Sequence, residues 1–214
     1  LIVLNELFRD GFIVTKLPTD EADRILEVIK GDTFVPDRPG SPDIAFWETD
    51  NPSQNQSVPE VYQAFVEALG RSEFTNHIRC HMGNWSRVNV MLQRGKAGDS
   101  MEWHHDSYDP MHMVCLAYFG EDGWCPEDGG QLEIGEGDVG EEGFLLDQSA
   151  VRVRASISPN HGTLVWMLNT NPRWVHRVTE IQCTKTRYTL IGQFGYRENV
   201  LRTRVSEKYG PTWR

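Results

Sequence analysis

The sequence predicts a mainly β domain with a helical N-terminal flank, built as an antiparallel sandwich or barrel. Before residue 85, two segments show the 3.6-residue period of amphipathic helices. From there onward the period changes to two, which is the period of a half-buried strand. Short apolar or alternating segments then recur without a helical pattern between them, as in all-β sandwiches and barrels. The further strand candidates are 113–119, 130–135, 151–157, 163–168, 174–179 and 186–195.

The N-terminal flank, residues 1–84, is predicted to contain one strand and two helices. Residues 11–17 are mostly apolar and β-branched, and they are expected to form the strand. A helix follows, with Thr19 as its cap, apolar residues at i, i+3, i+4 and i+7 from Ala22, and Gly31 as its stop.

Two loops and a second helix complete the prediction outside the core. Residues 32–56 are rich in Pro, Gly, Asp, Asn and Ser and are predicted to be a long loop. The second helix is expected to start at the capping-box pattern Ser57–Glu60 and to end at Gly70. Residues 136–150 are glycine-rich and acidic. Each loop is either a solvated connection or a lid over a site.

The first strand of the predicted core has two chemically different faces. Alternate residues on a strand point to opposite sides of the sheet. One face carries Val88, Val90 and Leu92. The other face carries Arg87, Asn89, Met91 and Gln93. The core is expected to span 85–196 of a single 1–214 domain, with 197–214 as a C-terminal extension.

Composition excludes several classes of protein. With 21 basic and 31 acidic residues the net charge is −10, whereas a nucleic-acid binder needs a basic patch. No stretch of 18 apolar residues suggests a membrane-spanning helix, and no secretory signal is visible. The four cysteines lack CxxC spacing, so we expect free thiols and a cytoplasmic protein. Composition says nothing about the oligomeric state.

The segment Trp103-His104-His105-Asp106 contains the first candidate for chemistry. On a strand, His104 and Asp106 present an imidazole and a carboxylate to the same side. A third ligand from a distant strand would complete a 2-His-1-carboxylate set, which favours non-haem Fe(II) and O₂ chemistry. His-x-Asp alone is equally explained by a polar pair without a ligand. His176, 70 residues after Asp106 and inside a strand pattern, is the candidate third ligand.

A second candidate lies on the last predicted strand. Arg187 stands 11 residues after His176 among apolar neighbours that suggest burial. A buried guanidinium needs an anionic partner, and a dicarboxylate co-substrate would supply one. Thr189 lies on the same face and could add a hydroxyl donor. The alternative is an ordinary surface cation at the edge of the sheet.

Taken together, His104-x-Asp106, His176 and Arg187-x-Thr189 resemble the motif of the Fe(II)/2-oxoglutarate-dependent oxygenases. The order of further features is similar to their prolyl-4-hydroxylase-like branch, although collagen-type members usually carry Lys where Arg187 stands. The resemblance covers roughly residues 85–196. The matching features are the glycine-containing turn 93–98, the apolar strand 115–118, Gly123-Trp124, Gly129-Gly-Gln-Leu132 and the opening segment 10–14.

The resemblance implies a double-stranded β-helix, which is a cupin-like jelly roll, and an Fe(II) ion held by the two His and the Asp. It implies that Arg187 and Thr189 bind 2-oxoglutarate, with O₂ as second co-substrate and ascorbate as a candidate reductant. Further co-substrate contacts are implied for Tyr118, Gln93, Leu116, Leu132 and Val178.

The implied reaction converts 2-oxoglutarate to succinate and CO₂ while a substrate C–H bond is oxidised. Related halogenases carry a small residue where Asp106 stands, so hydroxylation is the expected outcome here. Desaturation, cyclisation and epoxidation stay open.

The substrate is expected to be a small molecule, such as a free amino acid or a natural-product intermediate, because the acidic surface and the loop 32–56 could close over a small ligand. The alternatives are a peptidyl residue such as proline in a protein, and a metal-binding jelly roll without turnover. Each candidate substrate residue is also explained by core packing or surface pairing. These candidates are Trp47, Arg87, Asn89, Met91 and Trp166.

Overall fold

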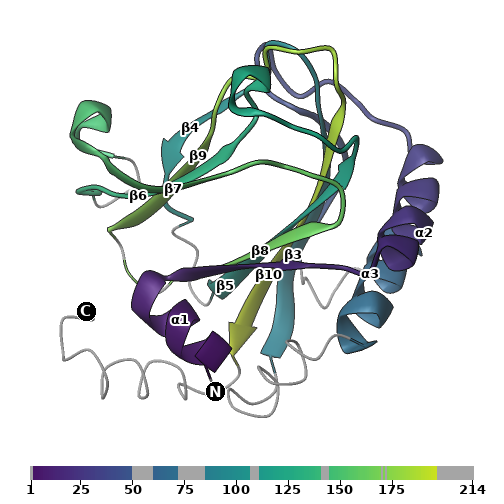
Figure 1. Cartoon of the computed structure of the whole chain (residues 1–214), viewed down its shortest axis with the longest axis horizontal. Helices are drawn as coiled ribbons and strands as arrows, with labels where there is room; N and C mark the ends of the chain where they lie inside the picture. The colour runs from purple at the N-terminus through teal and green to yellow at the C-terminus, as the bar shows by residue number, and fades with distance from the viewer. Residues whose placement is uncertain are drawn as a thin grey trace.

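Two antiparallel sheets pack face to face in the computed structural model, and helices cover the outer side of the larger sheet (Figure 1). This arrangement is the jelly roll that the sequence predicts. The structure describes residues 2–49, 60–71, 85–106, 111–140, 145–169, 171 and 173–196.

The ten described strands divide six to four between the sheets. The large sheet has the order β1 (Phe12–Lys16), β8 (Thr163–Leu168), β5 (Met111–Gly120), β10 (Arg187–Tyr196), β3 (Trp85–Gly95) and β2 (Asp43–Thr49). The small sheet has the order β4 (Met101–His104), β9 (Trp174–Val178), β6 (Leu132–Glu136) and β7 (Arg152–Ile157).

The helical flank packs on the outer face of the large sheet, where it buries the apolar stripes seen in the sequence (Figure 1). Ile25 and Phe65 join one buried cluster with Leu92 and Trp166 of the sheet. The described helices are α1 (Ile2–Asp10), α2 (Thr19–Lys30) and α3 (Glu60–Arg71), with short 3₁₀ turns at Pro126–Asp128 and Gln148–Ala150.

Strand β5 is buried on both faces, which explains its continuous apolar sequence. Its side toward the helices carries Met113, Cys115, Ala117 and Phe119. Its side toward the small sheet carries Val114, Leu116 and Tyr118, which pack with Leu132 and Ile134 of β6. The inner face of β5 therefore forms one wall of the space between the sheets.

All the strand candidates of the core are confirmed, but four expectations about the flank are wrong. The described part of the flank contains three helices rather than two, because α1 was not predicted. The predicted loop 32–56 contains strand β2, which pairs with β3 in antiparallel register. Pro18 rather than Thr19 occupies the N-cap of α2, without a side-chain cap, and the Pro18 carbonyl accepts a hydrogen bond from the Ala22 N–H at 3.0 Å. Helix α3 continues through Gly70 to Arg71. Residue 57, its predicted cap, lies outside the described residues.

Two expectations about the chain's chemistry can be compared with the structure. Cys115, Cys125 and Cys183 are free thiols, and Cys80 lies outside the described residues. Among the described helices, none is long and apolar enough to cross a membrane.

A buried carboxylate fastens β2 to β3 and gives the first testable prediction. Asp43 is 2% exposed, and it accepts hydrogen bonds from Arg94 Nη2 at 2.7 Å and Lys96 Nζ at 2.9 Å. These two cations hold the pKa of Asp43 below its usual value, against the opposing effect of burial. A carboxyl whose pKa is depressed by folding stabilises the fold above its unfolded pKa, and that contribution disappears as the pH falls through the folded pKa.

Asp43→Asn is therefore expected to lower the free energy of unfolding by about 1.5–3 kcal/mol at neutral pH, the usual cost of hydrogen bonds to a charged group. Urea unfolding of both proteins at neutral and at strongly acidic pH measures the difference. The difference should shrink in acid, because Asp43 of the wild-type chain becomes protonated there. A loss that is equal at both pH values would show that the charge of Asp43 is not its cause.

Candidate functional site

The two histidines of the predicted ligand set come from neighbouring strands of the small sheet. His104 ends β4, His176 lies in β9, and the two are register partners. Asp106 follows β4 by two residues. His104 Nε2 lies 3.8 Å from Asp106 Oδ1, and His176 Nε2 lies 3.7 Å from Asp106 Oδ2. All three ligand atoms lie within 4.8 Å of one another, so one metal ion can contact them together.

Hydrogen bonds restrain two of these residues, one at its side chain and one at its backbone. His104 Nδ1 lies 2.8 Å from the Glu102 carbonyl oxygen, which places the ring proton on Nδ1 and leaves the Nε2 lone pair for a metal. The Asn169 side-chain amide donates to the backbone carbonyl of Asp106. His105 is not part of this cluster.

Burial disfavours the charged forms of His176 and Asp106 in the protein without a metal ion. The pKa of His176 is well below its usual value because of burial, with added repulsion from His104 and His105. Burial also raises the pKa of Asp106, although His104 opposes this shift. A divalent cation would favour the neutral imidazole and the ionised carboxylate at the same time. The donor set therefore fits a metal ion.

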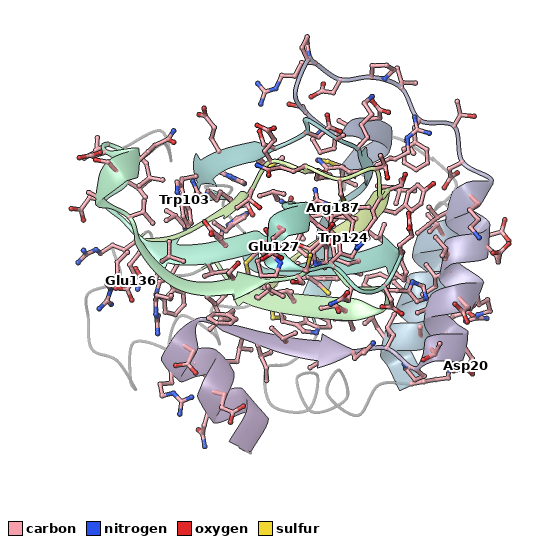
Figure 2. All side chains as sticks on the ribbon, turned by 45° about the horizontal axis from the view of Figure 1, so that its top comes forward. Asp20, Trp103, Trp124, Glu127, Glu136 and Arg187 are labelled. Atoms are coloured by element: carbon pink, nitrogen blue, oxygen red, sulfur yellow. The ribbon has the colours of Figure 1, made fainter. Side chains whose placement is uncertain are left out.

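Arg187 lies at the start of β10 among the strands in the middle of the molecule (Figure 2). It is 2% exposed and donates from Nη1 to the Gly130 carbonyl at 2.9 Å. Within the described residues no carboxylate lies at ion-pair distance from it, and burial lowers its pKa. A buried cation with only a neutral partner is costly, so this arrangement fits an anionic ligand.

The guanidinium's own Nε and two hydroxyls that line the same cavity lack hydrogen-bond partners within the described residues. These three buried atoms are Arg187 Nε, Thr189 Oγ1 and the Tyr118 hydroxyl oxygen. The guanidinium carbon lies 5.8 Å from the centre of the Tyr118 ring. Burial raises the pKa of Tyr118 to about 12, with Arg187 opposing the rise. Buried polar groups are normally paired, so three unpaired ones together indicate a missing ligand. A carboxylate would accept from all three.

The glycine turn before β6 carries the Gly130 carbonyl that accepts from Arg187. Gly129 has φ +70°, and a Cβ there would lie 1.8 Å from the Glu180 carbonyl oxygen. Only glycine fits this left-handed, crowded position. The Gly-Gly pair of the sequence motif therefore has a structural role beside Arg187.

One cavity of about 180 Å³ joins the ligand cluster to Arg187. It is lined by all of the metal and co-substrate residues that the sequence predicts: His104, Asp106, His176, Arg187, Thr189, Tyr118, Gln93, Leu116, Leu132 and Val178. It is also lined by Met91, one of the predicted substrate residues, and by four residues that the sequence analysis missed. These are Met101, Val114, Ile191 and Gln193. Strand alternation from Thr189 would have indicated Ile191 and Gln193.

The other predicted substrate residues do not join this cavity in the described part of the chain. Trp166 is fully buried in the cluster between the large sheet and the helices, and its indole N–H donates to Thr15 Oγ1 at 3.2 Å. Its prediction as a substrate residue is wrong because alternation along β8 turns it away from the interior between the sheets. Trp47 of β2 and Arg87 and Asn89 of β3 have side chains outside what the structure describes.

With this geometry established, comparison with known proteins decides the family. The family model of the 2OG-Fe(II) oxygenase superfamily matches residues 87–195, just over half of the chain. The chain belongs to this superfamily. It is therefore a dioxygenase that uses Fe(II), 2-oxoglutarate and O₂, as its sequence predicts.

Solved structures with the same fold are similar over nearly the whole chain. A Pseudomonas putida prolyl-4-hydroxylase is 21% identical with a TM-score of 0.62, and the match covers 92% of this chain and 98% of that one. A Trichoplax adhaerens prolyl hydroxylase in complex with a hypoxia inducible factor peptide fragment is 17% identical with a TM-score of 0.63, covering 93% and 90%. A Burkholderia pseudomallei oxidoreductase of the 2OG-Fe(II) oxygenase family is 14% identical with a TM-score of 0.66, covering 91% and 89%. At these identities the likeness shows the fold. No curated protein matches the chain significantly.

Proposed function

We propose that this oxygenase hydroxylates a C–H bond of an amino-acid residue in a protein or peptide, at an iron held by His104, Asp106 and His176. The observation that best supports the iron site is the convergence of three ligand atoms within 4.8 Å at one end of the cavity. Two imidazoles and one carboxylate leave coordination positions open for the co-substrates, as non-haem Fe(II) oxygenases require.

Arg187 is proposed to bind the far carboxylate of 2-oxoglutarate. Its unpaired Nε, the Thr189 hydroxyl and the Tyr118 hydroxyl supply donors for this group at the other end of the same cavity. Leu116, Leu132 and Val178 line the space between, where the methylene carbons would lie. The residues thus match a dicarboxylate with one end at the metal and the other at a buried cation.

The bound iron and co-substrates supply the oxidation, in which 2-oxoglutarate yields succinate and CO₂ and one oxygen atom enters the substrate. The protein's residues fix the geometry in which this occurs. The Glu102 carbonyl orients the His104 ring, and Asn169 holds the backbone of Asp106. The apolar wall from β5 and β6 keeps water away from the co-substrate.

A peptidyl substrate is better supported than the small molecule that the sequence analysis favoured. Two of the structures with this fold are prolyl hydroxylases, and one of them holds a peptide fragment. The cavity of about 180 Å³ is also below the roughly 300–1,000 Å³ of common ligand pockets. A cavity of this size takes the co-substrate, and we infer that the residue to be hydroxylated enters from outside.

Succinate release distinguishes these substrates. The iron-loaded protein should release succinate well above its background with a library of proline-containing peptides, and the responsive peptide should gain the mass of one oxygen atom. His176→Ala serves as the inactive control, because it removes one proposed ligand. Stimulation by free amino acids, with no response to peptides, would contradict the peptidyl proposal and restore the small-molecule expectation.

A further inference from the structure

The two proposed histidine ligands have neighbours that meet on the opposite face of the small sheet. Trp103 directly precedes His104 on β4, and Arg177 directly follows His176 on β9. Because His104 and His176 are register partners and successive residues alternate between faces, Trp103 and Arg177 lie side by side on the face away from the cavity. Figure 2 labels Trp103 on this part of the molecule, far from Arg187.

Contacts connect these neighbours across three strands. The Arg177 guanidinium carbon lies 4.9 Å from the centre of the Trp103 ring, within the range of a cation–π interaction. Glu133, the register partner of Arg177 on β6, accepts a hydrogen bond from Arg177 Nε at 2.6 Å, and Arg177 Nη2 forms an ion pair with the same carboxylate oxygen at 2.6 Å. Trp103 is 5% exposed, and a Cβ at Gly135 would lie 3.2 Å from its ring. The indole therefore packs across the sheet as far as β6.

Strand β4 needs such support more than the other strands of its sheet. It has four residues, lies at the edge, and pairs only with β9 in the described part of the structure. Its register with β9 shifts between Met101 and His104. Backbone pairing alone thus restrains His104 weakly, whereas the Trp103 ring anchors the residue immediately before it.

We propose that Trp103, Arg177 and Glu133 form a brace that positions His104 and His176 for metal binding. This inference rests on the proposed function, because it assumes that both histidines are ligands. None of the three residues lines the cavity. Arg177 is adjacent to His176 and contacts Trp103, which is adjacent to His104, and Glu133 holds Arg177 in place. Groups that orient metal ligands from outside the coordination sphere typically contribute about 10–100-fold to metal affinity.

Mn(II) binding to the metal-free protein, measured by calorimetry without co-substrate, tests the brace. Arg177→Met removes the guanidinium but keeps most of the stem, and Glu133→Gln keeps the size of the side chain. Arg177→Met is expected to lower Mn(II) affinity about 10-fold, and Glu133→Gln by a smaller factor. Trp103→Leu combined with Arg177→Met should lower affinity less than the product of the two single effects, because both act through one contact. The Co(II) absorption spectrum of each variant reports the altered ligand geometry directly.

Arg152→Met is the matched control. Arg152 on β7 pairs with Glu136 on β6 at 2.5 Å in the same sheet, but neither residue neighbours a proposed ligand. Its Mn(II) affinity and Co(II) spectrum should equal those of the wild type. Wild-type affinity and spectrum in both Arg177→Met and Glu133→Gln would overturn the brace. So would an equal loss in Arg152→Met, because the effect would then be a general weakening of the sheet.

The same experiment separates failure of the brace from failure of the metal site. His176→Ala should abolish Mn(II) binding if the proposed site is right. Wild-type binding in His176→Ala would overturn the metal site and the brace together. Loss of binding in His176→Ala with wild-type binding in Arg177→Met and Glu133→Gln would overturn the brace alone.

Discussion

Arg187→Met is expected to weaken 2-oxoglutarate binding by about 100-fold or more while Mn(II) binding stays intact. Removing one partner of a buried, hydrogen-bonded charge pair usually costs about 2–5 kcal/mol, and 2.7 kcal/mol corresponds to 100-fold. The guanidinium lines the cavity at the end away from the ligands, so its loss leaves the metal donors unchanged. Calorimetric titration of the Mn(II)-loaded protein with 2-oxoglutarate measures the effect.

A second measurement on this variant distinguishes a ligand-binding role from a structural one. Among the described residues Arg187 donates only to a neutral carbonyl, so the protein without co-substrate bears the cost of burying its charge. Arg187→Met should therefore melt at the same temperature as the wild type or higher when 2-oxoglutarate is absent. A structural arginine would give the opposite result.

Arg94→Met is the control for this pair of measurements. Arg94 lies on the neighbouring strand β3 and pairs with Asp43 outside the cavity. Its loss should lower stability and leave 2-oxoglutarate affinity unchanged. Wild-type 2-oxoglutarate affinity in Arg187→Met would remove this residue from the proposed co-substrate site.

Asp106→Ala is expected to abolish succinate formation and to weaken Mn(II) binding by about 100-fold or more, because it removes the single carboxylate of the ligand set. The fold should survive, since burial raises the pKa of Asp106 and thus disfavours its charged form in the metal-free protein. Mn(II) calorimetry and thermal melting test the two statements on the same sample.

Asp138→Ala gives the matched control for the loss of one acidic residue. Asp138 is an exposed partner of Arg173 at 3.3 Å and lies outside the cavity. This variant should bind Mn(II) and form succinate as the wild type does. Succinate formation by Asp106→Ala at the wild-type rate would mean that this carboxylate does not bind the iron.

Spacing and period predicted the core of the site because the chemistry depends on a few local rules. His104 and Asp106 are two residues apart, and Arg187 and Thr189 share one face of β10 by the same rule. The further co-substrate contacts were implied by the family resemblance rather than by spacing, and all of them line the cavity: Tyr118, Gln93, Leu116, Leu132 and Val178. The strands themselves were visible because their apolar residues alternate or run continuously.

The errors arose where hydrophobicity carries no directional information. All six residues of β8 are buried, so the sequence could not indicate which side of this strand faces the cavity, and Trp166 was placed on the wrong side. Strand β2 lies at the edge of its sheet in a segment of loop-like composition. Helix α1 was not predicted. It has only nine residues, a length at which a helix is marginally stable in isolation, and its packing through the fully buried Leu7 stabilises it in the fold.

The central claim is that one cavity binds iron at the two histidines and Asp106 and 2-oxoglutarate at Arg187. Anaerobic addition of Fe(II) and 2-oxoglutarate to the metal-free protein tests this claim most directly. A metal-to-ligand charge-transfer band should appear only when both are present. The band should be absent in Asp106→Ala, and in Arg187→Met at the same co-substrate concentration. A wild-type protein without this band, or an equally strong band in both variants, would contradict the claim.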